Sequence, residues 1–336
     1  MERSSDQDVH DPGATLQILS DLHLETPATR PSYSEFSFEK TSLYIALLGD
    51  IGLVNDSRLF SFLNVQLHRY KIVLYVLGNH EPYDSQVHIA KDTLKAFESE
   101  VALKAHQDDR LGKFVFLDQT RYDLTPSITI LGCTLYSAIS PDQASSARLF
   151  ITDFERIHEW NIDAHNAAHA SDLVWLNDQV NNITSHEANR RIVILTHSSP
   201  TIQAEANDSR HLKDNSGVRT AFMTDLSREP CWTSPAVVLW AFGHTHFNCD
   251  FVDPRIGKRV LANQKGYRRS EAEGFDPGKV VGVGAASTAN IAGSLDRVEE
   301  CEEQCSPMET DIEQNGHATP DRHKVGRLLQ FFRRHQ

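Results

Sequence analysis

Residues 238–250 read VLWAFGHTHFNCD, an apolar run that ends at a glycine and is followed by two histidines one residue apart. Neither His244 nor His246 suits a hydrophobic core, so their position directly after a buried strand needs another reason. Gly243 has no Cβ and lets the backbone turn closely beneath them. We therefore interpret this stretch as a core strand whose terminal histidines bind a ligand at the edge of a sheet.

Short apolar runs rich in β-branched residues recur along the chain and end at Gly, Asp or His. Such runs are typical of strands that are buried on both faces of a sheet. Helical apolar spacing in SRLFSFLNVQLHRY (57–70) and AKDTLKAFESEVALKAH (90–106) completes a strand, helix, strand pattern. We therefore predict an α/β (α+β) fold, two-layered or sandwiched, over residues 14–292. The predicted strands are Leu16–Leu19, Leu43–Leu48, Ile72–Leu77, Phe114–Leu117, Ile128–Leu135, Ile192–Leu195, Val237–Phe242, a hairpin over 249–263 and Val280–Val283.

Two of these segments invite more detailed predictions. Residues 128–135 alternate between apolar and smaller or polar residues, which predicts a strand with one wetter face. Ser171 precedes a stripe of apolar residues over 173–183, so we expect it to be the N-cap of a helix.

The chain of 336 residues has a formal net charge of −13 and five cysteines. This charge repels a nucleic-acid backbone, so long DNA or RNA is a disfavoured partner. No stretch has the roughly twenty apolar residues that span a bilayer. Residues 1–13 read as a polar, flexible N-terminus rather than a signal peptide. We expect an intracellular protein, cytoplasmic or nucleocytoplasmic, whose reduced thiols include Cys133, Cys231 and Cys249.

Residues 293–336 are acidic and poor in large apolar residues, which predicts a disordered tail. Its last segment, KVGRLLQFFRRHQ, has an apolar face ringed by arginines that suits a partner or an anionic membrane surface. A helix this short is marginal alone, so a solvated or self-docked tail is favoured. A flexible tail is also favoured over a small zinc finger, despite a finger-like spacing, because the intervening residues lack an apolar core. The residues with that spacing are Cys301, Cys305, His317 and His323.

Polar side chains of the kind that bind ligands follow the ends of nearly all the predicted core strands. The carboxyl ends of strands in an open α/β sheet form the crevice where ligands bind, so these separate segments are expected to converge. One such residue is a weak signal, but five segments of this kind in one chain point to a shared site. Besides the two opening histidines, the residues are Asp21, His23, Asp50, Asn79, His80 and His197.

The candidate ligands combine carboxylate and amide oxygens with imidazole nitrogens, a mixture that suits Mn, Fe or Zn rather than Ca or Mg alone. Seven of these eight residues act as donors, which exceeds the four of a single zinc site. Two ions about 3.5–4 Å apart that share one carboxylate need about this number. We therefore predict two divalent metal ions with Asp50 as the bridge.

The ordered series DLH (21–23), GD (49–50), GNHE (78–81), TH (196–197) and GHTH (243–246) resembles the calcineurin-like metallophosphoesterase superfamily. The resemblance extends from Leu16 to Ala285 and implies a β-sandwich flanked by helices, carrying a dinuclear metal centre. It implies that one metal is held by Asp21, His23, Asp50 and His246. It implies that the other is held by Asp50, Asn79, His197 and His244. The histidine of GNHE, His80, would face the phosphate without binding metal.

The chemistry implied by this resemblance is hydrolysis of a phosphate ester. Two cations lower the pKa of a bridging water enough to supply hydroxide near neutral pH, and this hydroxide attacks phosphorus in line. His80 is suited to protonate the leaving alkoxide or to stabilise its charge. We expect a small or exposed phosphate ester as the substrate. The alternatives are a nuclease or cyclic-nucleotide phosphodiesterase on the same centre, and a non-catalytic scaffold that retains metal and binds a partner.

Departures from related families narrow this expectation. Asp50 is followed by Ile51-Gly52-Leu53-Val54, which lacks the G-D-x-V-D-R-G motif of protein serine/threonine phosphatases. We therefore do not expect a protein phosphatase of that type. Leu53 also stands where purple acid phosphatases place a tyrosine ligand, so a tyrosinate-bound ferric ion is not expected. No ligand is missing, in contrast to scaffold proteins with this fold. What remains resembles the broad group of uncharacterised calcineurin-like phosphoesterases, many of them fungal.

Substrate choice is expected to lie in two insertions, 139–170 and 198–226, because the metal centre does not distinguish one phosphate ester from another. In the first, His165 and His169 are spaced to share a helix face. We expect solvated or capping histidines rather than a third metal, because no carboxylate or cysteine completes a set. In the second, a basic group would hold a second phosphate or a carboxylate, or would form a solvated loop. This group contains the substrate-binding candidate His211 together with Arg210, Lys213 and Arg219.

Overall fold

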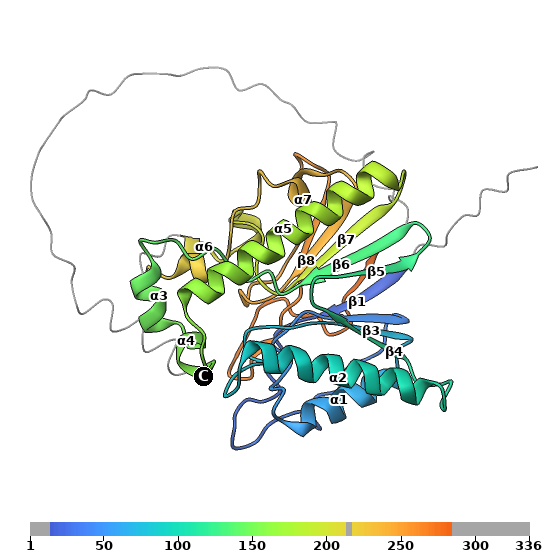
Figure 1. The fold of residues 1–336 in the computed structure, drawn as a ribbon. Coiled ribbons are helices and arrows are strands. Elements are labelled where there is room, and N and C mark those ends of the chain that lie inside the picture. Colours follow the sequence, from blue (N-terminus) through green and yellow to red (C-terminus); the bar gives the residue numbers. More distant parts are fainter. Residues whose placement is uncertain (1–13, 213–216, 284–336) are drawn as a thin grey trace, which may run out of the picture.

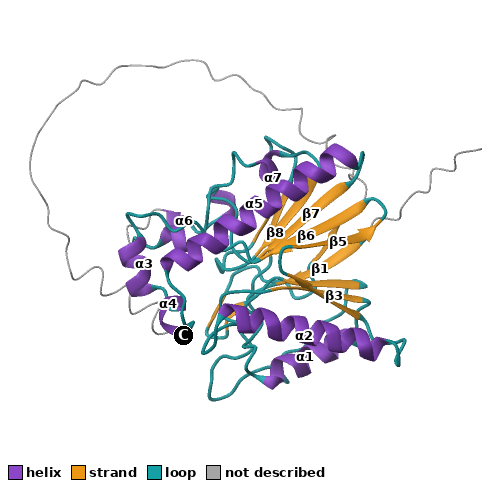
Figure 2. Ribbon diagram, viewed as in Figure 1, coloured by secondary structure: helices purple, strands orange, loops and turns teal. Residues whose placement is uncertain are grey.

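Two β-sheets pack face to face, and helices cover the outer face of each sheet (Figures 1 and 2). The computed structural model describes residues 14–212 and 217–283. The segments 1–13 and 293–336, with the finger-like spacing in the second, lie outside the described residues. The α/β sandwich expected from the apolar runs is confirmed.

The first sheet has the strand order β13-β1-β2-β3-β4. Strands β1 to β4 are parallel, and β13 pairs antiparallel with β1. Helices α1 (Ser57–Leu67) and α2 (Val87–Ala105) follow β2 and β3 and cover the outer face of this sheet (Figure 1). The strands are β1 Thr15–Leu19, β2 Tyr44–Leu47, β3 Ile72–Val76, β4 Lys113–Leu117 and β13 Val280–Gly282.

The second sheet has the strand order β5-β6-β7-β8-β10-β9. The four central strands are parallel, and the edge strands β5 and β9 pair antiparallel with their neighbours. Helices α5 (Ile162–His186) and α7 (Pro230–Thr233) lie on its outer face (Figure 1). The strands are β5 Thr120–Thr125, β6 Ile128–Cys133, β7 Arg191–Thr196, β8 Val237–Phe242, β9 Cys249–Val252 and β10 Arg259–Ala262.

Apolar side chains fill three layers: between α1, α2 and the first sheet, between the two sheets, and between the second sheet and α5 with α7. The middle layer takes Ile18 and Leu74 from one sheet and Ile130 and Leu195 from the other, all fully buried. The core strands are therefore covered on both sides, which is why their sequences are nearly continuous apolar runs.

Two local predictions are wrong. Every residue of β6 is buried, because β6 lies inside the second sheet, between the first sheet and α5. The hydroxyl of its buried Thr129 is satisfied by a 2.6 Å hydrogen bond that it donates to Asp123. Ser171 lies in the interior of α5 and accepts a hydrogen bond from Gln119. The N-cap is Asn161, whose side chain accepts from the backbone N–H of Ala164.

None of the helices among the described residues has the length and apolarity to cross a membrane.

The remaining elements are short. A small hairpin of β11 (Gly266–Tyr267) and β12 (Ser270–Glu271) stands apart from the two sheets. The two insertions contribute α3 Ala144–Phe150, α4 Asp153–Arg156, α6 Ser209–Leu212 and the 3-10 turns η1 Ala204–Ala206 and η2 Arg219–Ala221.

Candidate metal centre

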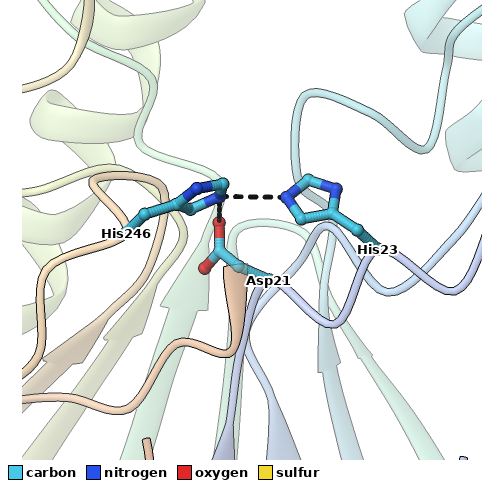
Figure 3. Close-up of side chains that lie close together, drawn as sticks. All are labelled: Asp21, His23 and His246. Atoms are coloured by element: carbon cyan, nitrogen blue, oxygen red, sulfur yellow. Dashed lines mark hydrogen bonds and ion pairs between the residues drawn. The ribbon is translucent and has the colours of Figure 1, made fainter. Parts of the chain in front are cut away.

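The predicted polar residues converge at the carboxyl ends of the parallel strands. Three sets of potential ligand atoms each lie within 4.8 Å of one another. His23 and Asp50 each belong to two of the sets, so the three sets form one continuous cluster. The sets are Asp21, His23 and His246 (Figure 3), then His23, Asp50 and His80, and then Asp50, His197 and His244.

The backbone at the cluster is strained. Five of the predicted ligands adopt positive φ angles of 45° to 71°, a region that residues other than glycine rarely occupy. Such conformations persist where the surrounding structure enforces them, and they concentrate at functional sites. These residues are Asp21, His23, Asp50, His244 and His246.

The glycines before two of the motifs allow close approach of the chain. A Cβ on Gly243 would lie 2.1 Å from Oγ of Ser20 and 2.5 Å from Oδ2 of Asp21. A Cβ on Gly49, which has a φ of +87°, would lie 2.5 Å from Nδ1 of His197. The strand ends can therefore meet only where these positions carry no side chain, as expected for Gly243.

In the first set, ring nitrogens and a carboxylate point at one another (Figure 3). Nε2 of His23 lies 3.0 Å from Nε2 of His246, which lies 3.3 Å from Oδ1 of Asp21. Nδ1 of His23 lies 3.2 Å from Oε1 of Glu25. Burial and the charge of His80 lower the pKa of His23 to about 3. His23 is therefore neutral, and with its Nδ1–H donated to Glu25 its Nε2 lone pair faces the set.

Hydrogen bonds outside the cluster fix the orientation of His197, which belongs to the last set, and of the neighbouring amide of Asn79. Nδ1 of His197 donates to the carbonyl of Leu48 at 2.8 Å, so its Nε2 is an acceptor. Nδ2 of Asn79 donates to Asp153 at 2.8 Å, so its Oδ1 faces Nε2 of His197 at 2.9 Å. Two acceptors thus meet without a proton between them. A cation would stabilise this arrangement, so the donors fit a divalent metal ion.

His244 completes the last set from the end of β8. Its Nε2 lies 3.3 Å from the carbonyl oxygen of Ala221 in η2 and donates to it, which leaves Nδ1 for the set. Its ring also stacks on Phe222. The insertion 198–226 therefore reaches the cluster directly.

Asp50 lies between the sets. Its Oδ2 is 3.8 Å from Nε2 of His23, and its Oδ1 is 3.5 Å from Nε2 of His197. Oδ1 also accepts a 2.9 Å hydrogen bond from the backbone N–H of His80. The two oxygens of one carboxylate therefore face different groups of ligands.

His80 has partners on both ring nitrogens. Nδ1 lies 3.1 Å from Glu25, and Nε2 lies 3.2 Å from the hydroxyl of Tyr267. Burial alone would lower the pKa of His80, but the charges of Asp50 and Glu25 and the hydrogen bond to Glu25 outweigh burial and raise it to about 9. His80 is therefore a buried cation at neutral pH in the metal-free protein.

Several residues that support the cluster were not predicted from the sequence. Glu25 accepts from both His23 and His80 through Oε1, and Asp153 holds the amide of Asn79. Glu81, the last residue of GNHE, accepts from the backbone N–H groups of Asp50, Ile51 and Gly78 and from the hydroxyl of Tyr75. A signal existed for Glu81 in its motif and for Glu25 in its position two residues after His23.

The insertions depart in part from expectation. His165 and His169 share a face of α5, but they are buried rather than solvated. His165 contacts the hydroxyl and backbone N–H of Ser137, and His169 donates to the carbonyl of Leu135. Neither histidine joins a set of metal-type ligands within the described part of the chain.

The basic group of the second insertion is described only in part. Arg219 donates to the carbonyl of Leu212. Arg210 and His211 lie in α6, but their side chains, like all of Lys213, lie outside what the structure describes. Substrate binding by His211 therefore stays a prediction.

Comparisons with known proteins agree with the geometry. The family profile "Calcineurin-like phosphoesterase" (Metallophos) matches residues 15–248. Uncharacterized protein L509 of Acanthamoeba polyphaga mimivirus is 26% identical over 282 residues, which cover 78% of this chain and 94% of the viral protein. The crystal structure of phosphopantetheinyl hydrolase from Mycobacterium tuberculosis has a similar fold, with a TM-score of 0.54 and 16% identity over 76% of this chain and 91% of that one. The profile match covers more than half of the sequence and ends just beyond the GHTH motif, so this chain belongs to the calcineurin-like phosphoesterase family.

Proposed function

We propose that the protein is a dinuclear metal-dependent phosphoesterase that hydrolyses a small or exposed phosphate ester. The position of Asp50 carries this proposal. Its two carboxylate oxygens face His23 on one side and His197 on the other, as a carboxylate shared by two ions requires. Metal-binding clusters of buried Asp and His are typical of the family to which the chain belongs.

The residues divide into two ligand groups that share Asp50. Divalent ions bound there would supply a hydroxide near neutral pH and neutralise the phosphate oxygens. The mixture of imidazole nitrogen and oxygen donors favours Mn, Fe or Zn. One group is Asp21, His23, Asp50 and His246. The other is Asp50, Asn79, His197 and His244.

His80 acts on the substrate and not as a ligand in this proposal. It belongs geometrically to the set with His23 and Asp50. However, Nδ1 donates to Glu25 and Nε2 contacts the hydroxyl of Tyr267, and in the metal-free protein the raised pKa keeps the ring protonated. A protonated imidazole has no lone pair for a metal. It is suited to hold a phosphate oxygen and to stabilise or protonate the leaving oxygen.

The direct test is the initial rate on p-nitrophenyl phosphate and on bis-p-nitrophenyl phosphate with added Mn²⁺. We expect turnover of one substrate that is abolished by Asp50→Asn and by a chelator. Asp108→Asn, which changes a partly exposed aspartate paired with Arg110, serves as the matched control and should retain full activity. The preferred substrate assigns the centre to monoester or diester chemistry, and a diester preference would favour a nucleotide phosphodiesterase.

Three outcomes would contradict the proposal. Full activity in a metal-stripped sample would exclude metal-dependent hydrolysis. Turnover that persists in Asp50→Asn would place the activity elsewhere. Absence of turnover on both substrates with Mn²⁺, Fe²⁺ and Zn²⁺, in protein that binds two ions, would favour a metal-bound scaffold.

A further inference from the structure

The hairpin of β11 and β12 is attached by backbone hydrogen bonds to the turn after β1, which carries Asp21 and His23. The backbone N–H of Lys265 donates to the carbonyl of Ser20 at 3.0 Å, and that of Gly266 donates to the carbonyl of Asp21 at 2.9 Å. Gly266 has a φ of +73°, which favours glycine and turns the chain into the hairpin. The next residue, Tyr267, is thereby placed against the cluster.

Tyr267 contacts three of the histidines. Its ring stacks on His23 with centroids 4.2 Å apart and meets His246 edge-on at 5.0 Å. Its hydroxyl oxygen lies 3.2 Å from Nε2 of His80. One side chain therefore covers the first ligand group and also places a hydroxyl beside the histidine proposed to face the phosphate.

The polar contacts of the Tyr267 hydroxyl differ from those of Tyr75 and Tyr83, two other buried tyrosines near the cluster. The hydroxyl of Tyr75 donates to Glu81, and that of Tyr83 donates to Asp153, so each ends on a buried carboxylate. The hydroxyl of Tyr267 has His80 as its polar partner within the described residues. A hydroxyl has one donor and two acceptor positions, so this contact leaves capacity for a further hydrogen bond.

We propose that Tyr267 is a catalytic residue that binds the phosphoryl group of the substrate together with His80. This inference rests on the proposed phosphoesterase function. A phosphate held by ions in the two ligand groups would lie beside the cluster that His80 and Tyr267 border, and its oxygens would accept hydrogen bonds. Preorganised donors at such a position stabilise charge as it develops and typically contribute about 100-fold or more in rate.

The ring has a separate effect. Because it stacks on His23, it shields the first ligand group from water and restrains the imidazole. Tyr267→Phe keeps this ring and removes the hydroxyl, whereas Tyr267→Leu removes both. Comparing the two variants therefore separates contact with substrate from support of a metal ligand.

The experiment uses the full-length protein loaded with Mn²⁺. We expect Tyr267→Phe to lower kcat about 100-fold on the preferred nitrophenyl substrate, with Mn²⁺ content and melting temperature unchanged. We expect calorimetry to show weaker binding of inorganic phosphate. Tyr267→Leu should show these losses and also bind Mn²⁺ more weakly. Tyr122→Phe, a half-buried tyrosine on the edge strand β5, is the matched control and should leave all readouts unchanged.

Phosphate binding separates this inference from the proposed function. If the native protein binds phosphate without turning over either substrate, the phosphoesterase proposal fails. The affinity of Tyr267→Phe for phosphate still tests whether the Tyr267 hydroxyl contacts the phosphoryl group. Phosphate affinity and kcat in Tyr267→Phe within twofold of native values would overturn the role of Tyr267. Failure of the native, metal-loaded protein to bind phosphate would overturn it as well.

Discussion

Oδ1 of Asp153 accepts a 2.8 Å hydrogen bond from Nδ2 of Asn79, which makes the amide present its oxygen to His197. Asp153 is buried at the start of α4, in the first insertion, and the same oxygen accepts from Tyr83 at 2.7 Å. An amide turned by 180° would direct N–H groups at the ligand set and repel a cation. Asp153, a residue of the first insertion, therefore determines that Asn79 presents an oxygen rather than an N–H group to the predicted metal site.

Replacement of Asp153 by alanine is expected to weaken one of the two proposed metal sites. Outer partners of metal ligands typically contribute about 10-fold to 100-fold in affinity, and here the lost partner fixes the amide of Asn79. Calorimetric titration with Mn²⁺ should show one weakened site of two. Asp153→Asn retains an acceptor oxygen and should restore most of the affinity. Two sites of native affinity in Asp153→Ala would show that the amide is oriented by other contacts.

Glu25 is expected to control the protonation of His80 in the metal-free protein. Burial alone would lower the pKa of His80, whereas the negative charges of Asp50 and Glu25 and the hydrogen bond to Glu25 raise it to about 9. Glu25→Gln keeps an acceptor oxygen but removes one charge, so the pKa should fall and the ring should lose its proton at lower pH. Imidazole NMR shifts followed against pH in a chelator measure this change, with the exposed His186 as an internal reference. An unchanged titration of His80 would show that Asp50 alone sustains the charge.

The convergence of the candidate ligands was predictable because they follow apolar runs in separate motifs, and parallel strands bring such ends together. The residues that support the candidate ligands could not be predicted from the sequence. Asp153 and Tyr267 reach the cluster only through tertiary contacts, and neither belongs to a motif. The differences at α5 share one cause: between Ile162 and Leu173 the helix has no large apolar residue, and its buried face there carries His165 and His169. The apolar stripe that begins at Leu173 therefore predicted a helix start near Ser171, and the two histidines were expected to be solvated or capping rather than buried.

Lys258 is expected to make stability depend on pH. It is 1% exposed, stands 4.7 Å from the ring centroid of Trp232, and donates to the carbonyls of Cys231 and Trp232. Burial lowers its pKa from 10.5 to about 7. Between these values the unfolded chain binds more protons than the folded chain, so this group makes stability rise with pH from about 7 to 10.

Urea unfolding of native protein and Lys258→Met at pH 7, 8.5 and 9.5 tests this relationship. The variant leaves two buried carbonyls without their donor, which should cost about 1–3 kcal/mol. The difference in unfolding free energy should widen as pH rises, because only the native protein is relieved of the buried charge. A difference that is constant across this range would contradict the lowered pKa.

Metal binding is expected to stabilise the folded protein. Without cations, burial and the neighbouring charges of Glu81 and Asp21 raise the pKa of Asp50, so the folded protein disfavours the ionised carboxylate. Ions that bind only the folded state add about 2.7 kcal/mol at a concentration 100 times Kd, which is a shift of several degrees in Tm. Mn²⁺ or Zn²⁺ should therefore raise the Tm of chelator-treated protein. Asp50→Asn should reduce this shift, because it removes the charge shared by both ligand groups, whereas Asp108→Asn should not. A shift of native size in Asp50→Asn would mean that the ions bind at another place on the chain.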